Sequence, residues 1–323
     1  MIELDEIGSY FYQQPTVAEW PALQTVWQHY ARNPGSWRLP ELACQAVGGE
    51  LRQVVPLITA VACCHISIVL VDDILDDDPK GLYRQLGTGE AANLGLAFQA
   101  VAYQIVQAAA NEMGWETAVQ QQILAELAHL NLKTAQGQHL DVQETRSEAH
   151  YWATVEAKST PYYGAGFFLG ALAGGAEEKL ADQLRHFGQL IGKIIQVSDD
   201  LADVYQIPAC PDWQRGGGNL AILYARLAEH PEQDRFEELL DQINEPTALE
   251  EAQQILLRSG AASYCIYQLL QLASEARTVL DGCTLTNPAI LQEFLAERVR
   301  HLFELLEENK MPLPEELAAA ILR

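Results

Sequence analysis

Basic residues are scarce in this sequence. Its 323 residues include 20 lysines and arginines against 44 aspartates and glutamates, which gives a formal net charge of −24. Nucleic-acid binding and docking on anionic lipid both need a basic surface. The composition therefore argues against both kinds of partner. A small anionic ligand remains compatible with an acidic protein if a divalent metal ion inverts the local field.

Cysteine patterns for metals or disulfides are also missing. The six cysteines include no Cys-x-x-Cys pair and no metal-ligand spacing, so we expect them to be buried and reduced. Residues 1–6 are acidic at the point where a secretory leader would be basic. No stretch reaches about 20 uncharged apolar residues, the length that spans a membrane. The sequence thus predicts a cytoplasmic protein without an integral membrane segment.

Strand patterns, repeats and linkers are absent as well. No alternating segment is bounded by Asn-Gly or Asp-Gly turns, and no stretch rich in proline, glycine or serine divides the chain. Apolar residues recur instead with a helical period. The periodic segments are residues 41–71, 90–113, 116–140, 148–174, 178–206, 217–229, 247–258, 261–281 and 288–308, and the first of them is interrupted near Gly48-Gly49 and Pro56. Several are apolar nearly all round, which favours one all-α domain over residues 1–323, built as a bundle around a buried helix.

Five aspartates crowd the end of one apolar segment. They occur in Asp72-Asp73-Ile74-Leu75-Asp76-Asp77-Asp78, directly after residues 66–71. Asp72 and Asp76 lie four positions apart, so they share one face of a helix, where like charges repel. Acidic side chains are also unfavourable at the C-terminal end of the helix dipole. Taken alone, the cluster fits either a solvated helix end or a metal site.

A second cluster favours the metal site. Asp199-Asp200-Leu201-Ala202-Asp203 ends another helical segment, and together with Gln196 its aspartates fall at positions i, i+3, i+4 and i+7. This is a polar stripe on an apolar helix, the reverse of an ordinary surface helix. Two Asp-Asp-x-x-Asp clusters that each end an apolar helix predict carboxylates facing each other across a cavity. Because the ligands are all oxygens, the expected ion is Mg²⁺, which shares substrate phosphates.

Fixed cations that could neutralise a diphosphate are few. The chain contains six lysines, and Lys158 is followed by Ser159 and then by the small-residue run Gly164-Ala165-Gly166. A lone lysine is more often a solvated surface charge. The apolar, glycine-rich setting nevertheless favours the hypothesis that Lys158 faces inward.

The order of these motifs resembles the trans-isoprenyl (polyprenyl) diphosphate synthase family. The segments that carry the resemblance are His65–Asp76 and Gln196–Asp203 for the two aspartate-rich helices, Gly137-Gln138-His139-Leu140-Asp141 for a motif between them, and Lys158-Ser159 for a Lys-Thr pair. The resemblance implies an isoprenoid-synthase-type helical bundle around a central apolar cavity. It also implies a homodimer that binds a prenyl diphosphate.

The resemblance assigns a role to each candidate residue. The implied Mg²⁺ ligands are Asp72, Asp76 and Asp199, with support from Asp73 and Asp203. The implied substrate-binding residues are His65, Lys158, Ser159 and Gln196, of which Lys158 and Gln196 would be catalytic. Arg84 is a further candidate for substrate binding, which would act from a position shifted from that of the family's arginines. The metals and Lys158 would neutralise the leaving diphosphate as the carbon–oxygen bond breaks. An apolar cavity would keep water away from the allylic cation.

The second, metal-free pocket that binds isopentenyl diphosphate in the family is altered here. Ser36 and Leu39 stand where the family has the lysine and arginine of Gly-Lys-x-x-Arg-Pro. The family's Arg-Arg aligns with Gly81-Leu82, and its late Gly-Lys aligns with Gly216-Gly217. His65 keeps its expected place. The cations that could substitute from shifted positions are Arg38, Lys80, Arg84 and Arg215.

Three functions fit this pattern. A trans-prenyltransferase that elongates the allylic substrate with isopentenyl diphosphate ranks first. A class I terpene synthase follows, because it ionises a single prenyl diphosphate and needs no second anion pocket. Prenyl transfer to a non-diphosphate acceptor comes next. A non-catalytic partner subunit is a weaker alternative, since such a subunit need not keep both aspartate clusters.

Overall fold

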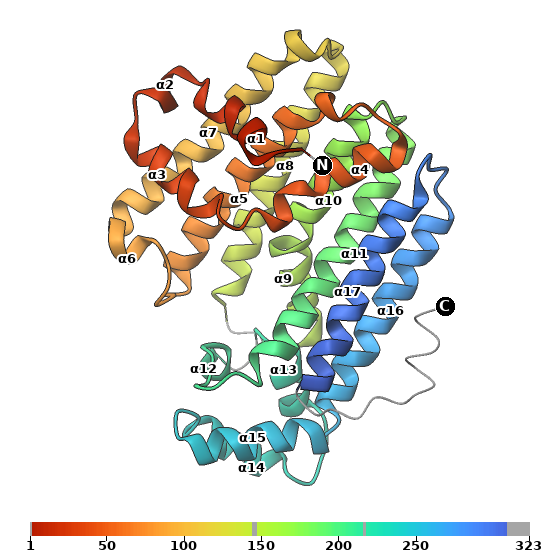
Figure 1. Cartoon of the computed structure of the whole chain (residues 1–323). Coiled ribbons are helices and arrows are strands. Elements are labelled where there is room, and N and C mark those ends of the chain that lie inside the picture. The colour runs from red at the N-terminus through yellow and green to blue at the C-terminus, as the bar shows by residue number, and fades with distance from the viewer. Residues whose placement is uncertain (1, 144–146, 216–217, 309–323) are drawn as a thin grey trace. The chain divides into compact units, whose positions relative to one another are not determined.

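The computed structural model describes residues 2–143, 147–215 and 218–308. Within these ranges the regular structure is entirely helical, which confirms the predicted all-α class (Figure 1). The α-helices are α1 Leu4–Tyr12, α2 Pro15–Ala18, α3 Pro21–Tyr30, α4 Leu39–Val47, α5 Val55–Leu75, α6 Tyr83–Leu86, α7 Thr88–Met113, α8 Thr117–Asp141, α9 Glu148–Lys158, α10 Thr160–Ala173, α11 Glu178–Asp203, α12 Asp212–Arg215, α13 Leu220–Leu227, α14 Gln233–Leu240, α15 Pro246–Arg258, α16 Ala261–Asp281 and α17 Pro288–Glu308. Short 3₁₀ turns occupy Gly35–Arg38 and Leu51–Gln53.

The chain divides into two units that interleave along the sequence. The first contains residues 1–136, 161–189 and 279–291, and the second contains residues 137–160, 190–278 and those from 292 on. The single domain over residues 1–323 stays a prediction.

Helix α5 is the core helix of the first unit. It is buried on nearly every side between Val55 and Leu70, and it packs along α7. Residues 51–75 are long and apolar enough to cross a membrane by length and composition, but 78% of their most apolar window is buried inside the protein. That burial is typical of a bundle's central helix. The helix ends at Leu75, so the first aspartate cluster lies at its C-terminal end.

Helices α9, α11 and α13 form the part of the second unit that carries the second aspartate cluster. The side chain of Asn219 caps α13 by accepting from the backbone N–H of Ala221 at 3.0 Å. Its amide nitrogen donates to the backbone oxygen of Asp200 on α11 at 2.7 Å. The start of α13 is thereby fixed to the end of α11, because Asn219 is fully buried and both of its polar atoms are used.

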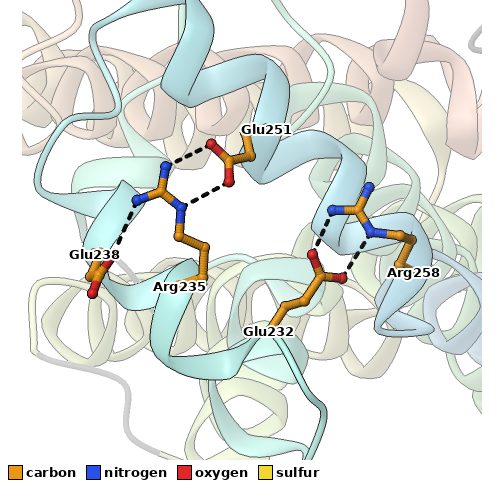
Figure 2. Close-up of polar contacts among 5 residues, drawn as sticks. All are labelled: Glu232, Arg235, Glu238, Glu251 and Arg258. Carbon is orange, nitrogen blue, oxygen red and sulfur yellow. Dashed lines mark hydrogen bonds and ion pairs between the residues drawn. The ribbon is translucent and has the colours of Figure 1, made fainter.

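Helices α14 and α15 pack as a pair joined by exposed ion pairs (Figure 2). Arg235 donates to both carboxylate oxygens of Glu251, at 2.8 and 2.7 Å, and also to Glu238. Arg258 donates to both oxygens of Glu232, at 2.8 and 2.7 Å. Exposed pairs contribute up to about 1 kcal/mol each, so these contacts orient the helices more than they stabilise the unit.

Some predicted segments differ from the observed helices. The segment 148–174 is two helices, which break at Ser159 because Pro161 opens the first turn of α10 and disfavours helical backbone before it. The predicted interruption of the segment 41–71 is confirmed: Gly48, with a φ of 82°, ends α4 in the left-handed conformation, and Pro56 lies in the first turn of α5. Helices α1–α3, α6, α12 and α14 were not predicted. All are ten residues or shorter, so their periodicity covers less than three helical turns.

Candidate functional site

The first aspartate cluster has a pair of carboxylates that suits a cation. Asp72 and Asp76 lie one turn apart at the end of α5, and each presents an oxygen within 4.8 Å of the other's. Both side chains are half-buried. Asp73 lies between them in sequence, and its pKa is raised to about 6 by burial, with a further contribution from the negative charges of Asp78 and Asp72. A divalent cation would relieve this repulsion.

The other two aspartates of this cluster, Asp77 and Asp78, form hydrogen bonds within the loop that follows α5. Asp77 has a φ of 55°, and its carboxylate accepts from the Tyr83 hydroxyl at 2.9 Å and from Arg84 at 2.6 Å. Asp78 accepts from the backbone N–H of Lys80 at 2.7 Å. Arg84, expected to bind substrate, is therefore paired with a carboxylate of its own loop.

The second cluster, on α11, separates into side chains with different surroundings. Asp199 is exposed and Asp203 is half-buried, whereas Asp200 is only 1% exposed. The pKa of Asp203 is raised to about 6, mainly by burial and in addition by the charges of Asp212 and Asp199. Consecutive residues on a helix are rotated by about 100°, so neighbouring aspartates face different environments. The expectation that the two clusters face each other stays a prediction.

Asp200 is an internal hydrogen-bond acceptor. One carboxylate oxygen accepts from the Tyr151 hydroxyl at 2.6 Å and from the backbone N–H of Leu220 at 2.8 Å. The other oxygen accepts from the side-chain amide of Gln196 at 2.9 Å. The pKa of Asp200 is raised to about 7, because burial outweighs the three hydrogen bonds, which lower it.

A pocket in the second unit brings several candidate residues together. Lys158, Ser159 and Gln196 line it, along with Asp141, Tyr151 and Thr154. The ammonium of Lys158 lies 2.6 Å from a carboxylate oxygen of Asp141, and the hydroxyl of Ser159 donates to the Gln196 carbonyl at 2.6 Å. The arrangement places one cation, one carboxylate and oriented polar groups in a single pocket. Such a set can bind an anion and hold its counter-ions.

Tyr151, Thr154 and Asp141 were not among the predicted site residues. Tyr151 and Thr154 precede Lys158 by seven and four positions on α9, a spacing that places all three on one helix face. This periodicity could have found them. Asp141 belongs to the Gly137–Asp141 motif, which had been singled out as a sequence pattern only.

Gly137 explains how α8 and α9 approach each other at this pocket. A Cβ atom at Gly137 would lie 2.2 Å from the backbone nitrogen of Lys158. Only glycine permits such a close approach of two backbones. The contact holds the end of α8, with Asp141, against the end of α9, with Lys158.

The described positions of the altered anion pocket, which are Ser36, Leu39, His65 and Gly81-Leu82, belong to the first unit and carry no fixed charge. His65 accepts from the indole N–H of Trp37 at 3.2 Å, and its ring centre lies 5.2 Å from that of Tyr162. Burial lowers the pKa of His65 to about 4, so the imidazole is uncharged at pH 7. The Tyr162 hydroxyl donates to the backbone oxygen of Ser36 at 3.1 Å.

Two of the four cations predicted to replace the missing ones are paired with carboxylates. Arg38 pairs with the buried carboxylate of Glu41 at 2.8 Å, and Arg84 pairs with Asp77. Lys80 is exposed. The side chain of Arg215 and the predicted Gly216-Gly217 segment lie outside the described residues.

Comparison with known proteins assigns the chain to a family. The profile of the family described as "Polyprenyl synthetase" matches residues 36–256. Geranylgeranyl diphosphate synthase of Methanosarcina mazei is 32% identical over 172 residues, which cover 50% of this chain and 52% of that protein. The short chain isoprenyl diphosphate synthase of Methanothermobacter thermautotrophicus is 26% identical over 278 residues, covering 80% and 83%. The alignment with the first of these relatives therefore spans about half of its length.

A solved structure shows the same fold. The polyprenyl synthase of Caulobacter crescentus, complexed with calcium and isoprenyl diphosphate, superposes with a TM-score of 0.73 at 20% identity, over 92% of this chain and 96% of that one. This likeness confirms the predicted isoprenoid-synthase-type bundle. Because the family profile covers more than half of the sequence, the chain belongs to the polyprenyl synthetase family.

Proposed function

We propose that the protein is a Mg²⁺-dependent trans-prenyltransferase that ionises an allylic prenyl diphosphate and elongates it with isopentenyl diphosphate. The observation that carries the proposal is the pocket in which Lys158, Ser159 and Gln196 lie together beside Asp141. The names of the relatives, geranylgeranyl and short chain isoprenyl diphosphate synthase, support the choice of reaction.

Oxygen ligands support the choice of Mg²⁺. The proposed ligands are Asp72, Asp76 and Asp199, assisted by Asp73 and Asp203. Hard divalent cations prefer such carboxylate sets. Burial, with added repulsion from neighbouring aspartates, raises the pKa of both Asp73 and Asp203, and a bound cation would offset both effects. When bound, Mg²⁺ supplies charge neutralisation of the leaving diphosphate. The chain itself contributes Lys158, whose ammonium would bind a diphosphate oxygen and stabilise the charge that develops there.

Gln196 and Ser159 would orient the substrate beside Lys158. Their mutual hydrogen bond leaves the second amide hydrogen of Gln196 and the hydroxyl oxygen of Ser159 available to a ligand. Val155 lines the same pocket as Lys158. An apolar side chain at this position would help to exclude water from the cation that forms after ionisation.

Product analysis tests the proposal. The purified protein is incubated with Mg²⁺ and geranyl or farnesyl diphosphate, with and without isopentenyl diphosphate. We expect a longer prenyl diphosphate only when both substrates are present, and none in excess EDTA. Failure to convert any allylic diphosphate in either mixture would overturn the proposal.

A class I terpene synthase is the second candidate, and the altered anion pocket favours it. Elongation needs two diphosphates bound together, yet His65 is neutral, and Arg38 and Arg84 are paired with carboxylates. Each lost charged partner costs about 1.5–3 kcal/mol of binding, so elongation should require high concentrations of isopentenyl diphosphate. Diphosphate release from farnesyl diphosphate alone, with a hydrocarbon or alcohol product, would place the terpene synthase first.

We also propose that the protein is a cytoplasmic homodimer. Leu96 on α7 and Leu132 on α8 are 69% and 73% exposed, and covering large apolar side chains is a common basis of self-association. The six cysteines are free, as expected in a reducing compartment. Light scattering should give the mass of a dimer for the wild type and of a monomer for Leu96→Glu combined with Leu132→Glu. The same change at exposed Leu227 on α13 serves as the control.

A further inference from the structure

Asp200 belongs to the second aspartate motif, yet its surroundings differ from those of a metal ligand. Its side chain is 1% exposed, and both of its oxygens are occupied by hydrogen-bond donors. The donors come from three helices, namely Tyr151 on α9, Gln196 on α11 and the first backbone N–H of α13 at Leu220. A metal ion could reach this carboxylate only by displacing these donors, of which Tyr151 and Leu220 are themselves buried.

The contact with Asp200 determines which way the Gln196 amide points. An amide has a donor end and an acceptor end, and a carboxylate can only accept. The Gln196 nitrogen therefore faces Asp200, and its carbonyl faces Ser159, whose hydroxyl donates to it at 2.6 Å. A flipped amide would place the carbonyl of Gln196 against the Asp200 carboxylate, and two acceptors without a proton repel.

Tyr151 forms a hydrogen bond with Asp200, the carboxylate that orients the Gln196 amide. Its hydroxyl is 2.6 Å from Asp200, and its side chain is 2% exposed and also lines the pocket. A short hydrogen bond to a charged acceptor is among the stronger contacts in proteins. The hydrogen bonds thus run from Tyr151 through Asp200 and Gln196 to Ser159, next to Lys158.

We propose that Tyr151 and Asp200 are positioning residues that fix the orientation of the Gln196 amide toward the substrate, and that Asp200 is not a metal ligand. The inference rests on the proposed function in one respect, because Gln196 is taken to contact the allylic substrate. The expected consequence is on the chemical step, since a misoriented amide still leaves Lys158 and the metal ligands to bind the diphosphate.

Steady-state kinetics with Tyr151→Phe tests the consequence. With saturating Mg²⁺, we expect kcat for the allylic substrate to fall about fivefold and KM to change less than about twofold. Asp200→Asn, which can present a donor to the amide, should lower kcat further. Tyr205→Phe is the matched control, because the buried Tyr205 hydroxyl has no hydrogen-bond partner among the described residues.

A double-mutant cycle separates positioning from a structural effect. In a Gln196→Ala background, Tyr151→Phe should cause no further loss of the single-turnover rate, because the group it positions is gone. An equal loss with and without the Gln196 amide would overturn the inference. A rise in KM at unchanged kcat would overturn it as well.

Side-chain NMR gives a readout that does not depend on turnover. The Gln196 amide is assigned by the signal lost in Gln196→Ala, and its protons should exchange with water at least about tenfold more slowly than those of exposed glutamines. Asp200→Asn should remove that protection, and Tyr151→Phe should reduce it. Unprotected amide protons in the wild type would overturn the inference even if the enzyme is active. A protected amide in a protein that converts no allylic diphosphate would overturn the proposed function alone.

Discussion

Adjacent carboxylates of one motif perform different tasks in this protein. Asp199 is exposed, whereas Asp200, one position further along α11, is buried and accepts three hydrogen bonds. In the first cluster, Asp72 and Asp76 form a close carboxylate pair, whereas Asp77 fastens the following loop. A count of aspartates therefore overstates the number of side chains that can bind a cation.

Neutralising a proposed metal ligand should abolish turnover without unfolding the protein. We expect Asp72→Asn and Asp199→Asn to lose activity, while their melting temperatures in EDTA stay equal or rise slightly, because like-charge repulsion is relieved. Turnover assays and circular dichroism melts measure the two effects. Asp77→Asn is the control within the first cluster and should keep its activity. Near-wild-type turnover in either ligand variant would remove that aspartate from the metal site.

His65 should make the protein less stable in mild acid. Burial lowers its pKa to about 4, so below pH 6.5 the unfolded chain binds a proton that the folded chain does not. Stability that is present above pH 6.5 is lost as the pH falls toward 4, and this group alone accounts for about 2 kcal/mol between pH 7 and 5. Urea titrations should show a smaller loss for His65→Gln, which keeps an acceptor for Trp37 but does not titrate. Parallel pH curves for the two proteins would contradict a buried, neutral His65.

At the scale of elements, the contact between α8 and α9 should control the pocket. A Cβ at Gly137 would meet the Lys158 backbone at 2.2 Å, so Gly137→Ala should cost roughly 1–3 kcal/mol of stability and displace Lys158. Gly89→Ala on α7 is the control, because no atom lies within 4 Å of its added Cβ, and it should gain up to about 1 kcal/mol. Denaturant melts and turnover measure both variants. An active, stable Gly137→Ala protein would show that the backbones can separate without effect.

Long helices could be predicted from the sequence because their apolar period extends over many turns. Helices α7, α8, α11, α16 and α17 begin and end within three residues of the predicted segments. The short N-terminal helices and α14 have too few turns to produce such a signal. The spacing also predicted the polar stripe on α11. It could not predict that Asp200 is buried, because the burial depends on a contact with the backbone N–H of Leu220, which lies twenty positions later in the sequence.

The pairing of charges could not be predicted for a similar reason. Arg84 is a plausible anion-binding residue by position, yet the left-handed turn at Asp77 brings that carboxylate onto it. Lys158 and Gln196 do lie in one pocket, and their spacing of 38 positions carries no information about that proximity. Their roles in catalysis stay predictions.

At the scale of the whole molecule, the large negative net charge means that a diphosphate should bind only together with a divalent metal ion. The net charge of −24 repels a free diphosphate, and Lys158 is already paired with Asp141. Binding should therefore require a divalent cation that neutralises the aspartates. Metal and diphosphate are expected to bind together, with each raising the affinity for the other.

The most direct test of this account is the melting temperature of the protein with Mg²⁺, with inorganic diphosphate, and with both. At one hundred times its Kd, a ligand that binds only the folded state adds about 2.7 kcal/mol to stability. We expect that stabilisation with both ligands present and little with either alone, and Asp72→Asn and Asp199→Asn should each abolish it. A melting shift of the same size produced by diphosphate in excess EDTA would contradict a metal-bridged diphosphate site.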